Sequence, residues 1–449
     1  MRILHYALGF PPYRTGGLTK YCVDLMKLQK KEGHSVALMW PGKISVVNKK
    51  VHVVKHKGWN SIGNFELINP LPVALDEGIV NVDAYIQATS KEIFWSFLGK
   101  YKPDVIHIHT LMGLYSEFIN VANEMKIKVI YTSHDYFGIC PKVTLFYNGK
   151  VCDEVECKNC YACNQGALSL KKIILLQSPV YRKLKNTALI KKMRKVHRNN
   201  FFDNEKKQKE DVNDRRHECE YETLRQYYIE MLKKVDVIHF NSSLTASVYC
   251  KYFEPKNYKV IPITHNDIRD NRKIKRFESN CLNLTYLGPA KEFKGFYFLI
   301  SVLDNLWNEE ITNFKLKIFT QISINRPYIE CEPYGYNYGQ LKEIFASTDL
   351  LVAPSLWYET FGFTVLEALS YGVPVLVSDH VGAKDIVSMI QPEGVLPVKE
   401  ENFVNAIRKI IQNRKILCEY NYKICNTDIL PKQLPYEELY TFEGESNEC

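Results

Sequence analysis

Apolar and polar positions follow a repeating rhythm along the chain, in which short apolar segments alternate with longer amphipathic ones. The first apolar segment, Ile3–Leu8, precedes a loop with proline and glycine, a helical pattern at Leu18–Lys31 and a second apolar segment at Ser35–Trp40. The same order returns between residues 105 and 132. Strands that alternate with helices predict parallel strands joined by right-handed crossovers. We therefore predict a doubly wound α/β domain over residues 1–265.

The rhythm restarts beyond residue 281, with helical patterns between new apolar segments. A chain of 449 residues is also longer than one hydrophobic core normally supports, so length alone favours two domains. We predict a second Rossmann-like domain over 266–430 and a tail, 431–449, that packs back on the first domain. The apolar segments of the second domain lie at 282–287, 314–319, 350–353 and 373–377.

A charged, helical stretch at 165–234 interrupts the pattern between the two halves. We predict that it is an insertion in the first domain, because the apolar segment after it, 235–241, has the pattern of a strand that rejoins the first sheet. Open parallel sheets bind ligands beyond the carboxyl ends of their strands. Two such domains that face each other form an active site in the cleft between them, so function is to be sought in the loops that follow the strands.

The segment APSLWYETFGFTVLEALSYGVPVLVS at 353–378 carries the densest chemistry. A buried strand leads to a loop with Glu359, and Phe361, Gly362 and Phe363 then lead into a helix that contains Glu367. The free N–H groups at a helix start, with a glycine that permits close approach, suit the phosphates of a nucleotide. The two carboxylates suit hydroxyl groups of a sugar and a ribose. Spacing alone equally fits a solvated loop carboxylate and a helix-dipole glutamate.

The frame P-S-x-x-x-E-x-F-G-x-x-x-x-E-A at 354–368 resembles the signature of the large family of retaining GT-B glycosyltransferases often called family four, or group 1. The resemblance implies a GT-B fold, with two Rossmann-like domains across a cleft, and sugar transfer from a nucleotide-sugar. It implies that Glu359 lies beside the donor sugar and that Glu367 holds the ribose. It also implies that the backbone amides of Phe361, Gly362 and Phe363 face the sugar and the phosphate.

Three further segments resemble motifs of the same family, so the resemblance covers nearly the whole chain. Gly16 and Gly17 resemble the glycine loop of the first domain, which approaches the donor phosphates and admits the acceptor. YKPDVIHIHTLMGL at 101–114 and YTSHDYFGICP at 131–141 resemble the two strand ends that carry histidines. The resemblance places His134 near the reacting sugar, with Asp135 beside it. His107 and His109 are weaker candidates, because such histidines more often belong to the core or rim.

LTYLGPAKEFKGF at 284–296 resembles the loop of the second domain whose basic side chains neutralise the diphosphate. Lys294 matches the family lysine. Pro289 stands where many relatives have an arginine, and Lys291 is the candidate for the missing charge. The resemblance implies catalysis by Glu359, His134 and Lys294 without a required metal or other cofactor, and it assigns no protein nucleophile. Charge that gathers on the departing diphosphate requires fixed positive charge and amide dipoles beside it.

A cluster of cysteines occupies the loop 140–163, after the second histidine segment. Cys152, Cys157, Cys160 and Cys163 follow a C-x4-C-x2-C-x2-C pattern, with Cys140 shortly before them. Four thiolates within a dozen residues suit Zn²⁺ or an iron–sulfur cluster. Reduced thiols that pack the loop are the alternative. A structural zinc at these four residues is our prediction, because similar cysteines follow the histidine strand in part of the family.

Charge is concentrated in one part of the chain. The net charge is +9, yet residues 171–198 hold ten Lys or Arg and no acid, so the rest is near neutral. Apolar residues interleaved with these cations predict basic helices on an anionic membrane surface, broken in two by Pro179. A solvated helical cover on the first domain is the alternative. No apolar run approaches the roughly 18 to 20 residues of a spanning helix, which predicts a cytoplasmic protein, peripheral on the membrane face.

The function that the resemblance implies is that of a retaining, hexosyltransferase-type enzyme of surface polysaccharide or glycoconjugate biosynthesis. Its partners would be a UDP- or GDP-sugar donor and a glycan or lipid-linked acceptor. A GT-B-fold phosphorylase or another sugar-nucleotide-processing enzyme is the alternative. A nucleic-acid-binding protein with a zinc knuckle is disfavoured, since the knuckle lacks a histidine and the basic segment lacks a stacking array. No G-x-G-x-x-G follows the first strand, which argues against a Rossmann oxidoreductase.

Overall fold

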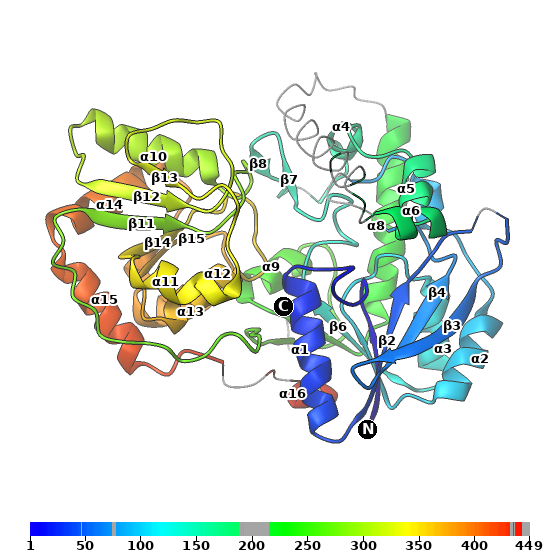
Figure 1. The fold of residues 1–449 in the computed structure, drawn as a ribbon. Coiled ribbons are helices and arrows are strands. Elements are labelled where there is room, and N and C mark those ends of the chain that lie inside the picture. The colour runs from blue at the N-terminus through cyan, green and yellow to red at the C-terminus, as the bar shows by residue number, and fades with distance from the viewer. Residues whose placement is uncertain are drawn as a thin grey trace.

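The protein folds into two α/β domains, each built around its own sheet (Figure 1). The computed structural model describes the chain except residues 46, 74–77, 154, 186, 188–189, 191, 193–214, 432–433, 435 and 442–449. The first domain holds the β-strands β1–β6, β9 and β10, and the second holds β11–β16. The doubly wound α/β class that the sequence predicts is confirmed.

The first sheet has eight strands in the order β10-β9-β6-β5-β1-β2-β4-β3. All neighbours pair in parallel except the edge strand β3, which pairs antiparallel with β4. The strands are β1 (Arg2–Tyr6), β2 (Ser35–Pro41), β3 (His52–Trp59), β4 (Ile62–Ile68), β5 (Val105–Ile108), β6 (Lys128–Ser133), β9 (Val237–Phe240) and β10 (Tyr258–Val260). The main helices are α1 (Gly17–Lys31), α2 (Lys91–Tyr101), α3 (Ser116–Glu124), α8 (Arg215–Lys233) and α9 (Ser243–Cys250).

The second sheet has six parallel strands in the order β13-β12-β11-β14-β15-β16. They are β11 (Leu282–Tyr286), β12 (Phe314–Ile318), β13 (Ile329–Cys331), β14 (Leu350–Ala353), β15 (Val375–Ser378) and β16 (Val395–Leu396). The helices are α10 (Phe296–Asn308), α11 (Leu341–Ala346), α12 (Phe363–Ser370), α13 (Lys384–Ile390), α14 (Glu400–Gln412) and α15 (Lys415–Asn426).

Central strands of both sheets are buried over most of their length, because helices cover both faces of a parallel sheet. In the second domain this gives the apolar runs LLVA in β14 and VLVS in β15. In the first domain β5 reads VIHI and β9 reads VIHF, and every residue of both strands is buried. Each of these two strands therefore carries a histidine into an otherwise apolar core.

The cysteine loop ends in the short helix α4 (Cys160–Asn164), and the insertion after it forms the short helices α5 (Leu170–Leu176) and α6 (Pro179–Leu184) on the first domain. Pro179 is the first residue of α6, and the Ser178 side chain caps the helix by accepting from the Tyr181 N–H. The predicted break at Pro179 is thus present, since proline fits the first turn of a helix and ends the one before it. Residues 186, 188–189, 191 and 193–198 of the basic segment lie outside the described residues. Among the described helices, none has the length and apolar character needed to cross a membrane.

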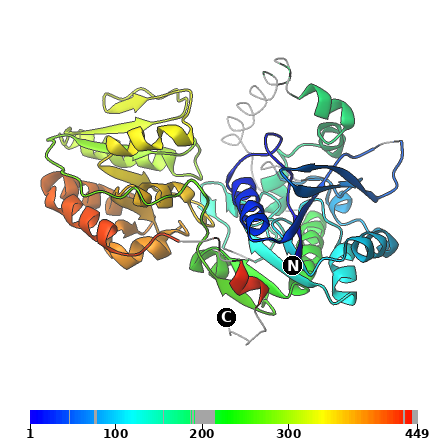
Figure 2. The same cartoon turned by 60° about the horizontal axis from the view of Figure 1, so that its bottom comes forward.

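The chain returns to the first domain at its end. After α15 it runs to the short helix α16 (Glu437–Tyr440), which lies against the first domain in both views (Figures 1 and 2). The Lys128 ammonium on β6 donates to the Tyr440 carbonyl at 2.9 Å. The Tyr440 side chain is buried in the first domain, so the last described helix belongs to the packing of the domain where the chain began.

Candidate active site

Glu359 lies on the loop between β14 and α12, at the carboxyl end of the second sheet. Its backbone forms a short parallel bridge with Val381. The Glu359 N–H donates to the His380 carbonyl at 2.8 Å, and the Glu359 carbonyl accepts from the Gly382 N–H at 2.9 Å. These bonds fix the loop on both sides of the carboxylate, as a preorganised site requires.

The turn from this loop into α12 depends on Gly362. Its φ is +99°, a left-handed conformation that other residues adopt at a cost, and a Cβ there would lie 2.9 Å from a methyl carbon of Val381. In the first turn of α12 the Val365 N–H donates to the Gly362 carbonyl at 3.1 Å, whereas the N–H groups of Phe363 and Thr364 have no hydrogen-bond partner among the described residues. The loop therefore presents free amides beside Glu359.

Lys294 lies against the same loop. Its ammonium donates to Glu359 Oε1 at 2.7 Å, and both side chains are 23% exposed. The ammonium also lies 4.8 Å from the centroid of the Trp357 ring. The following residue, Gly295, packs so closely that a Cβ there would lie 1.8 Å from the Pro354 carbonyl oxygen. Lys291, on the same loop, has its ammonium 5.1 Å from the Phe293 ring centroid. Lys294 is the lysine that donates to Glu359.

Glu367 is buried on α12, one to two turns after the helix start, with 4% of its surface exposed. Its Oε1 lies 3.3 Å from Nε2 of His265, a buried histidine beyond β10. The His265 ring also contacts the Phe363 ring, with centroids 4.9 Å apart. Burial, and then the nearby Glu367 carboxylate, raise the pKa of Tyr338. Glu367 is therefore held in a small polar cluster where the two domains meet.

Loops from the first domain meet this loop directly. A Cβ on Gly17 would lie 3.2 Å from the Phe363 ring, so the Gly16-Gly17 loop touches the start of α12. The Thr360 hydroxyl donates to the His134 carbonyl at 3.0 Å, and the Thr360 carbonyl accepts from the hydroxyls of Ser242 at 2.7 Å and Thr245 at 2.9 Å.

His134 follows β6, and its Nε2 lies 3.2 Å from Nδ1 of His109. Burial, and then the nearby His239, lower the pKa of His134 from 6.5 to about 3, so the ring is neutral at neutral pH. Asp135 accepts from the Phe137 N–H at 2.9 Å, a local turn contact. His107 and His109 are buried within the first sheet.

The cysteines gather around Arg225 of α8, whose guanidinium lies 3.7 Å from Cys160 Sγ. The Cys160 thiol hydrogen-bonds to Cys157 and lowers the pKa of the Cys157 thiol. Of the described cysteines, no three sulfur atoms lie within 4.8 Å of one another. The four predicted ligands therefore do not form a closed thiolate tetrahedron in this arrangement, and zinc binding stays a prediction.

Three residues of the site were not predicted from the sequence: His265, Thr360 and Tyr358. The Tyr358 hydroxyl donates to Asp153 of the cysteine loop at 2.7 Å. Tyr358 and Thr360 occupy variable positions of the frame around Glu359, and His265 lies in no motif. Each of the three acts through a partner more than 100 residues away.

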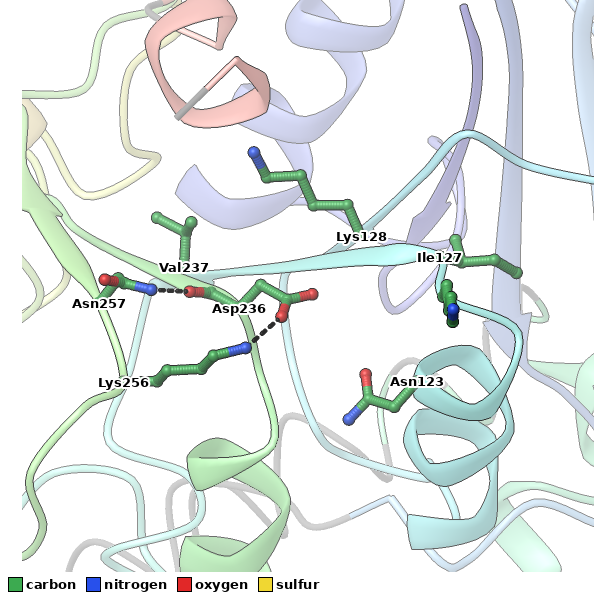
Figure 3. Close-up of a pocket in the computed structure, with 8 residues that line it drawn as sticks. Asn123, Ile127, Lys128, Asp236, Val237, Lys256 and Asn257 are labelled. Carbon is green, nitrogen blue, oxygen red and sulfur yellow. Dashed lines mark hydrogen bonds and ion pairs between the residues drawn. The ribbon is translucent and has the colours of Figure 1, made fainter. Parts of the chain in front are cut away.

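A separate cavity of about 720 Å³ lies beside β6 and β9 (Figure 3). Lys256 pairs there with Asp236 at 2.8 Å. Asp236 and Ile127 immediately precede the two strands, which places the cavity at their amino ends. It therefore lies at the edge of the sheet opposite to the loops described above.

Two family models match the chain. Residues 15–151 match the model described as Glycosyltransferase Family 4, and residues 267–424 match the model described as Glycosyl transferases group 1. A curated relative, an uncharacterized 42.6 kDa protein in the cps region of Klebsiella pneumoniae, is 22% identical over 311 residues. That match covers 69% of this chain and 66% of the relative, just under two thirds of its length.

Solved structures share the whole fold at low identity. WaaG, a glycosyltransferase involved in lipopolysaccharide biosynthesis, is 15% identical with a TM-score of 0.54, over 98% of this chain and 99% of that one. HepE from Anabaena, in complex with UDP and glucose, is 11% identical with a TM-score of 0.54, over 95% and 94%. Sucrose-phosphate synthase from Thermosynechococcus elongatus is 14% identical with a TM-score of 0.52, over 98% and 96%.

The solved structures establish the arrangement of the two domains, and the family models cover the segments that carry the glycine loop, the histidines, Lys294 and both glutamates. The predicted GT-B fold is therefore confirmed. The chain has the GT-B fold, and each of its two halves matches a glycosyltransferase family model.

Proposed function

We propose that the protein transfers a hexosyl group, with retention, from a UDP- or GDP-sugar to a glycan or lipid-linked acceptor in surface polysaccharide biosynthesis. The observation that carries this proposal is the Lys294–Glu359 pair beside the free amides at the start of α12. The polysaccharide assignment is supported by the similarity to WaaG and to a protein of a cps region, and the donor class by the UDP complex of HepE.

The chemistry follows from the leaving group. Sugar transfer passes through an oxocarbenium-like transition state while negative charge gathers on the departing diphosphate. Lys294 and the amides around Phe363 are positioned to meet that charge, and Glu359 holds the ammonium in place while its second oxygen accepts from a sugar hydroxyl. Glu367 would accept from the ribose hydroxyls. No residue is assigned as a nucleophile.

A panel of UDP-, GDP- and ADP-sugars in a thermal-shift assay tests the donor class. A ligand that binds only the folded state raises the melting temperature. Release of the nucleoside diphosphate should then require an acceptor, and the anomeric configuration of the product should match that of the donor. Activity that depends on inorganic phosphate instead of a nucleotide would assign the chain to the phosphorylases and overturn the proposal.

The structural zinc is proposed for Cys152, Cys157, Cys160 and Cys163. It requires the loop to draw its sulfur atoms closer than they lie here. The hydrogen bond with Cys160 lowers the pKa of the Cys157 thiol, but burial raises the pKa of the Cys152 and Cys163 thiols, so zinc would have to displace their protons on binding. Elemental analysis of protein purified without chelator should show about one zinc per chain. Serine at both 157 and 160 should abolish it, whereas Cys281→Ser should not. Metal-free wild-type protein would leave the thiols as packing residues.

The membrane surface is proposed for α5 and α6. Leu175, Val180 and Leu184 are 59%, 62% and 47% exposed on these helices, among basic residues and no acids. The Lys185 ammonium lies 4.3 Å from the ring centroid of Tyr13, which is 60% exposed on the loop before Gly16. An apolar, basic face thus adjoins the acceptor-side loop, which fits an anionic lipid surface that carries the acceptor.

Co-sedimentation with anionic liposomes tests this surface. Binding should be strong at low salt and weaken as salt screens the charge. Glutamine at Lys171, Lys172 and Lys183, which are all exposed, should release the protein. Glutamine at the exposed lysines Lys50, Lys55 and Lys57 removes the same charge elsewhere and should not. Equal pelleting of the two triple variants would contradict the assignment.

A further inference from the structure

A line of polar side chains crosses the apolar core of the first sheet. His239 on β9, Thr132 on β6, His107 on β5 and His5 on β1 lie on four adjacent strands. His239 Nδ1 lies 3.1 Å from the Thr132 hydroxyl, which lies 2.7 Å from His107 Nε2. At one end, His239 Nε2 lies 2.8 Å from the Ile261 carbonyl.

The C-terminal helix closes the gap between His107 and His5. The Tyr440 hydroxyl lies 2.9 Å from His107 Nδ1 and accepts from the Gln29 amide at 2.9 Å. The other end of the Gln29 amide, Oε1, lies 2.7 Å from His5 Nε2. A residue of the tail is therefore a link in a hydrogen-bond chain at the centre of the first domain.

The hydrogen-bond chain ends at His134 of the candidate active site. His5 Nδ1 lies 2.9 Å from His109 Nε2, and His109 Nδ1 lies 3.2 Å from His134 Nε2. The nitrogens of His5, His107 and His109 come within 4.8 Å of one another, close enough for a metal. Every one of these nitrogens already has a hydrogen-bond partner, however, which favours a polar network.

Burial keeps all five rings neutral. It lowers the pKa of His5 and of His239 to about 4 and that of His134 to about 3, and it lowers the pKa of His107 and His109 well below 6.5. A neutral imidazole has one N–H donor and one acceptor nitrogen. The state of one nitrogen therefore determines the other, and a linear chain of such rings has only one direction once an end is fixed.

The Ile261 carbonyl fixes that end, because a carbonyl only accepts. His239 Nε2 must donate to it, so His239 Nδ1 accepts from the Thr132 hydroxyl and His107 Nε2 donates to Thr132. His107 Nδ1 then accepts from Tyr440, whose oxygen accepts from the Gln29 amide. The Gln29 amide has its nitrogen toward Tyr440 and its oxygen toward His5, which is the arrangement that this donor order requires.

The same rule completes the chain. Gln29 Oε1 must accept from His5 Nε2, so His5 Nδ1 accepts from His109 Nε2 and His109 Nδ1 accepts from His134 Nε2. We infer that this chain fixes His134 with its proton on Nε2 and its lone pair on Nδ1, and that Tyr440 is a positioning residue for it. Among the described residues, none hydrogen-bonds to His134 Nδ1.

The lone pair on Nδ1 is thus the group that His134 offers to a ligand, as an acceptor from a hydroxyl of the sugar or of the acceptor substrate. This chemical consequence rests on the proposed function, whereas the tautomer itself does not. A fixed tautomer matters for transfer because a ring with its proton on Nδ1 would donate where it needs to accept.

Nitrogen NMR of ¹⁵N-histidine-labelled protein reads the tautomer directly, with the His134 signal assigned from a His134→Gln variant. In the full-length wild type, His134 should be neutral with its proton on Nε2. Tyr440→Phe removes the link to the Ile261 end, so a second population with the proton on Nδ1 should appear. Tyr436→Phe is the matched control and should change neither signal. The Tyr436 hydroxyl contacts His34 and Glu32, outside the hydrogen-bond chain, and phenylalanine keeps the ring that packs on Tyr440 with centroids 5.1 Å apart.

A second pair of variants tests the hydrogen-bond chain at Thr132, between His239 and His107. Thr132→Val should also release the tautomer, and Thr132→Ser, which keeps the hydroxyl, should restore it. Once a donor is identified, Tyr440→Phe should lower kcat about tenfold with donor KM unchanged, as expected for a misplaced proton acceptor. A wild-type His134 with its proton on Nδ1, or an unchanged signal in Tyr440→Phe, would overturn the inference. Lack of activity with every nucleotide-sugar would overturn only the proposed function.

Discussion

Lowering the pH from about 7.5 to about 5.5 is expected to destabilise the first domain strongly. His5, His107, His109 and His239 are each at most 1% exposed, and burial lowers the pKa of each below the ordinary value of 6.5. The unfolded chain titrates near 6.5, so below that pH the unfolded state binds more protons than the folded one. Above pH 6.5 the neutral rings make their full contribution to the free energy of unfolding, and this contribution is lost as the pH falls towards 4.

The size of this loss in stability depends on how far the pH lies below 6.5, the pKa of a histidine in the unfolded chain. At a pH one unit below 6.5, each ring that stays neutral in the fold costs about 1.4 kcal/mol relative to the protonated unfolded chain. The four fully buried rings cost about 5 kcal/mol together, a large share of the roughly 5–15 kcal/mol that stabilises a typical protein. The partly exposed His134, whose pKa is also lowered, adds to this loss. For a domain of this size, we expect a melting temperature lower by roughly 10 °C.

Differential scanning calorimetry at constant ionic strength measures this effect. His239→Gln removes one titrating ring and should reduce the pH-dependent loss by about a quarter, whereas His52→Gln on the edge strand β3 should not. A wild-type melting temperature that stays constant over this pH range would refute the reasoning, because the buried histidines would then have to be charged or exposed in the folded state.

Three substitutions test the donor side of the site. Lys294→Met should lower kcat/KM at least about tenfold, since a preorganised charge contact is worth 1.4 kcal/mol or more. Lys315→Met breaks an exposed pair with Glu330 of the same 2.7 Å length and should leave activity within about twofold. Glu359→Gln should also lower turnover at least about tenfold while the protein stays folded, and wild-type transfer by this variant would remove Glu359 from the site. Glu367→Gln should weaken nucleotide binding more than it slows transfer, which calorimetric titration with the nucleoside diphosphate would measure; unchanged affinity would contradict the ribose assignment.

Much of the fold could be predicted because apolar periodicity is a local signal. The helix predicted at Leu18–Lys31 is α1 (Gly17–Lys31), and the apolar segment 350–353 is β14, so both lie where the pattern places them. The antiparallel edge hairpin of β3 and β4 was not predicted. Half of the residues of its strand β3 are exposed and the other half are partly buried, so the strand carries little apolar pattern, as edge strands commonly do.

Only those residues of the candidate site that belong to a recognisable sequence motif could be predicted. Glu359, Glu367 and Lys294 stand in such motifs, and the structure places Lys294 on Glu359. The histidine chain could not be predicted, since its members come from both ends of the sequence. Gln29 and Tyr440 are 411 residues apart, and nothing local to either residue indicates that the two side chains meet.

The return of α16 to the first domain has a consequence for protein engineering. Chimeras that exchange donor domains are a direct route to new sugar specificities, and the simplest design would join residues 1–265 of this chain to the second half of a relative. That design would also replace Tyr440, and with it a side chain buried in the core of the first domain. A chimera of this protein should instead be cut twice, before β11 and after α15, so that the native α16 is kept.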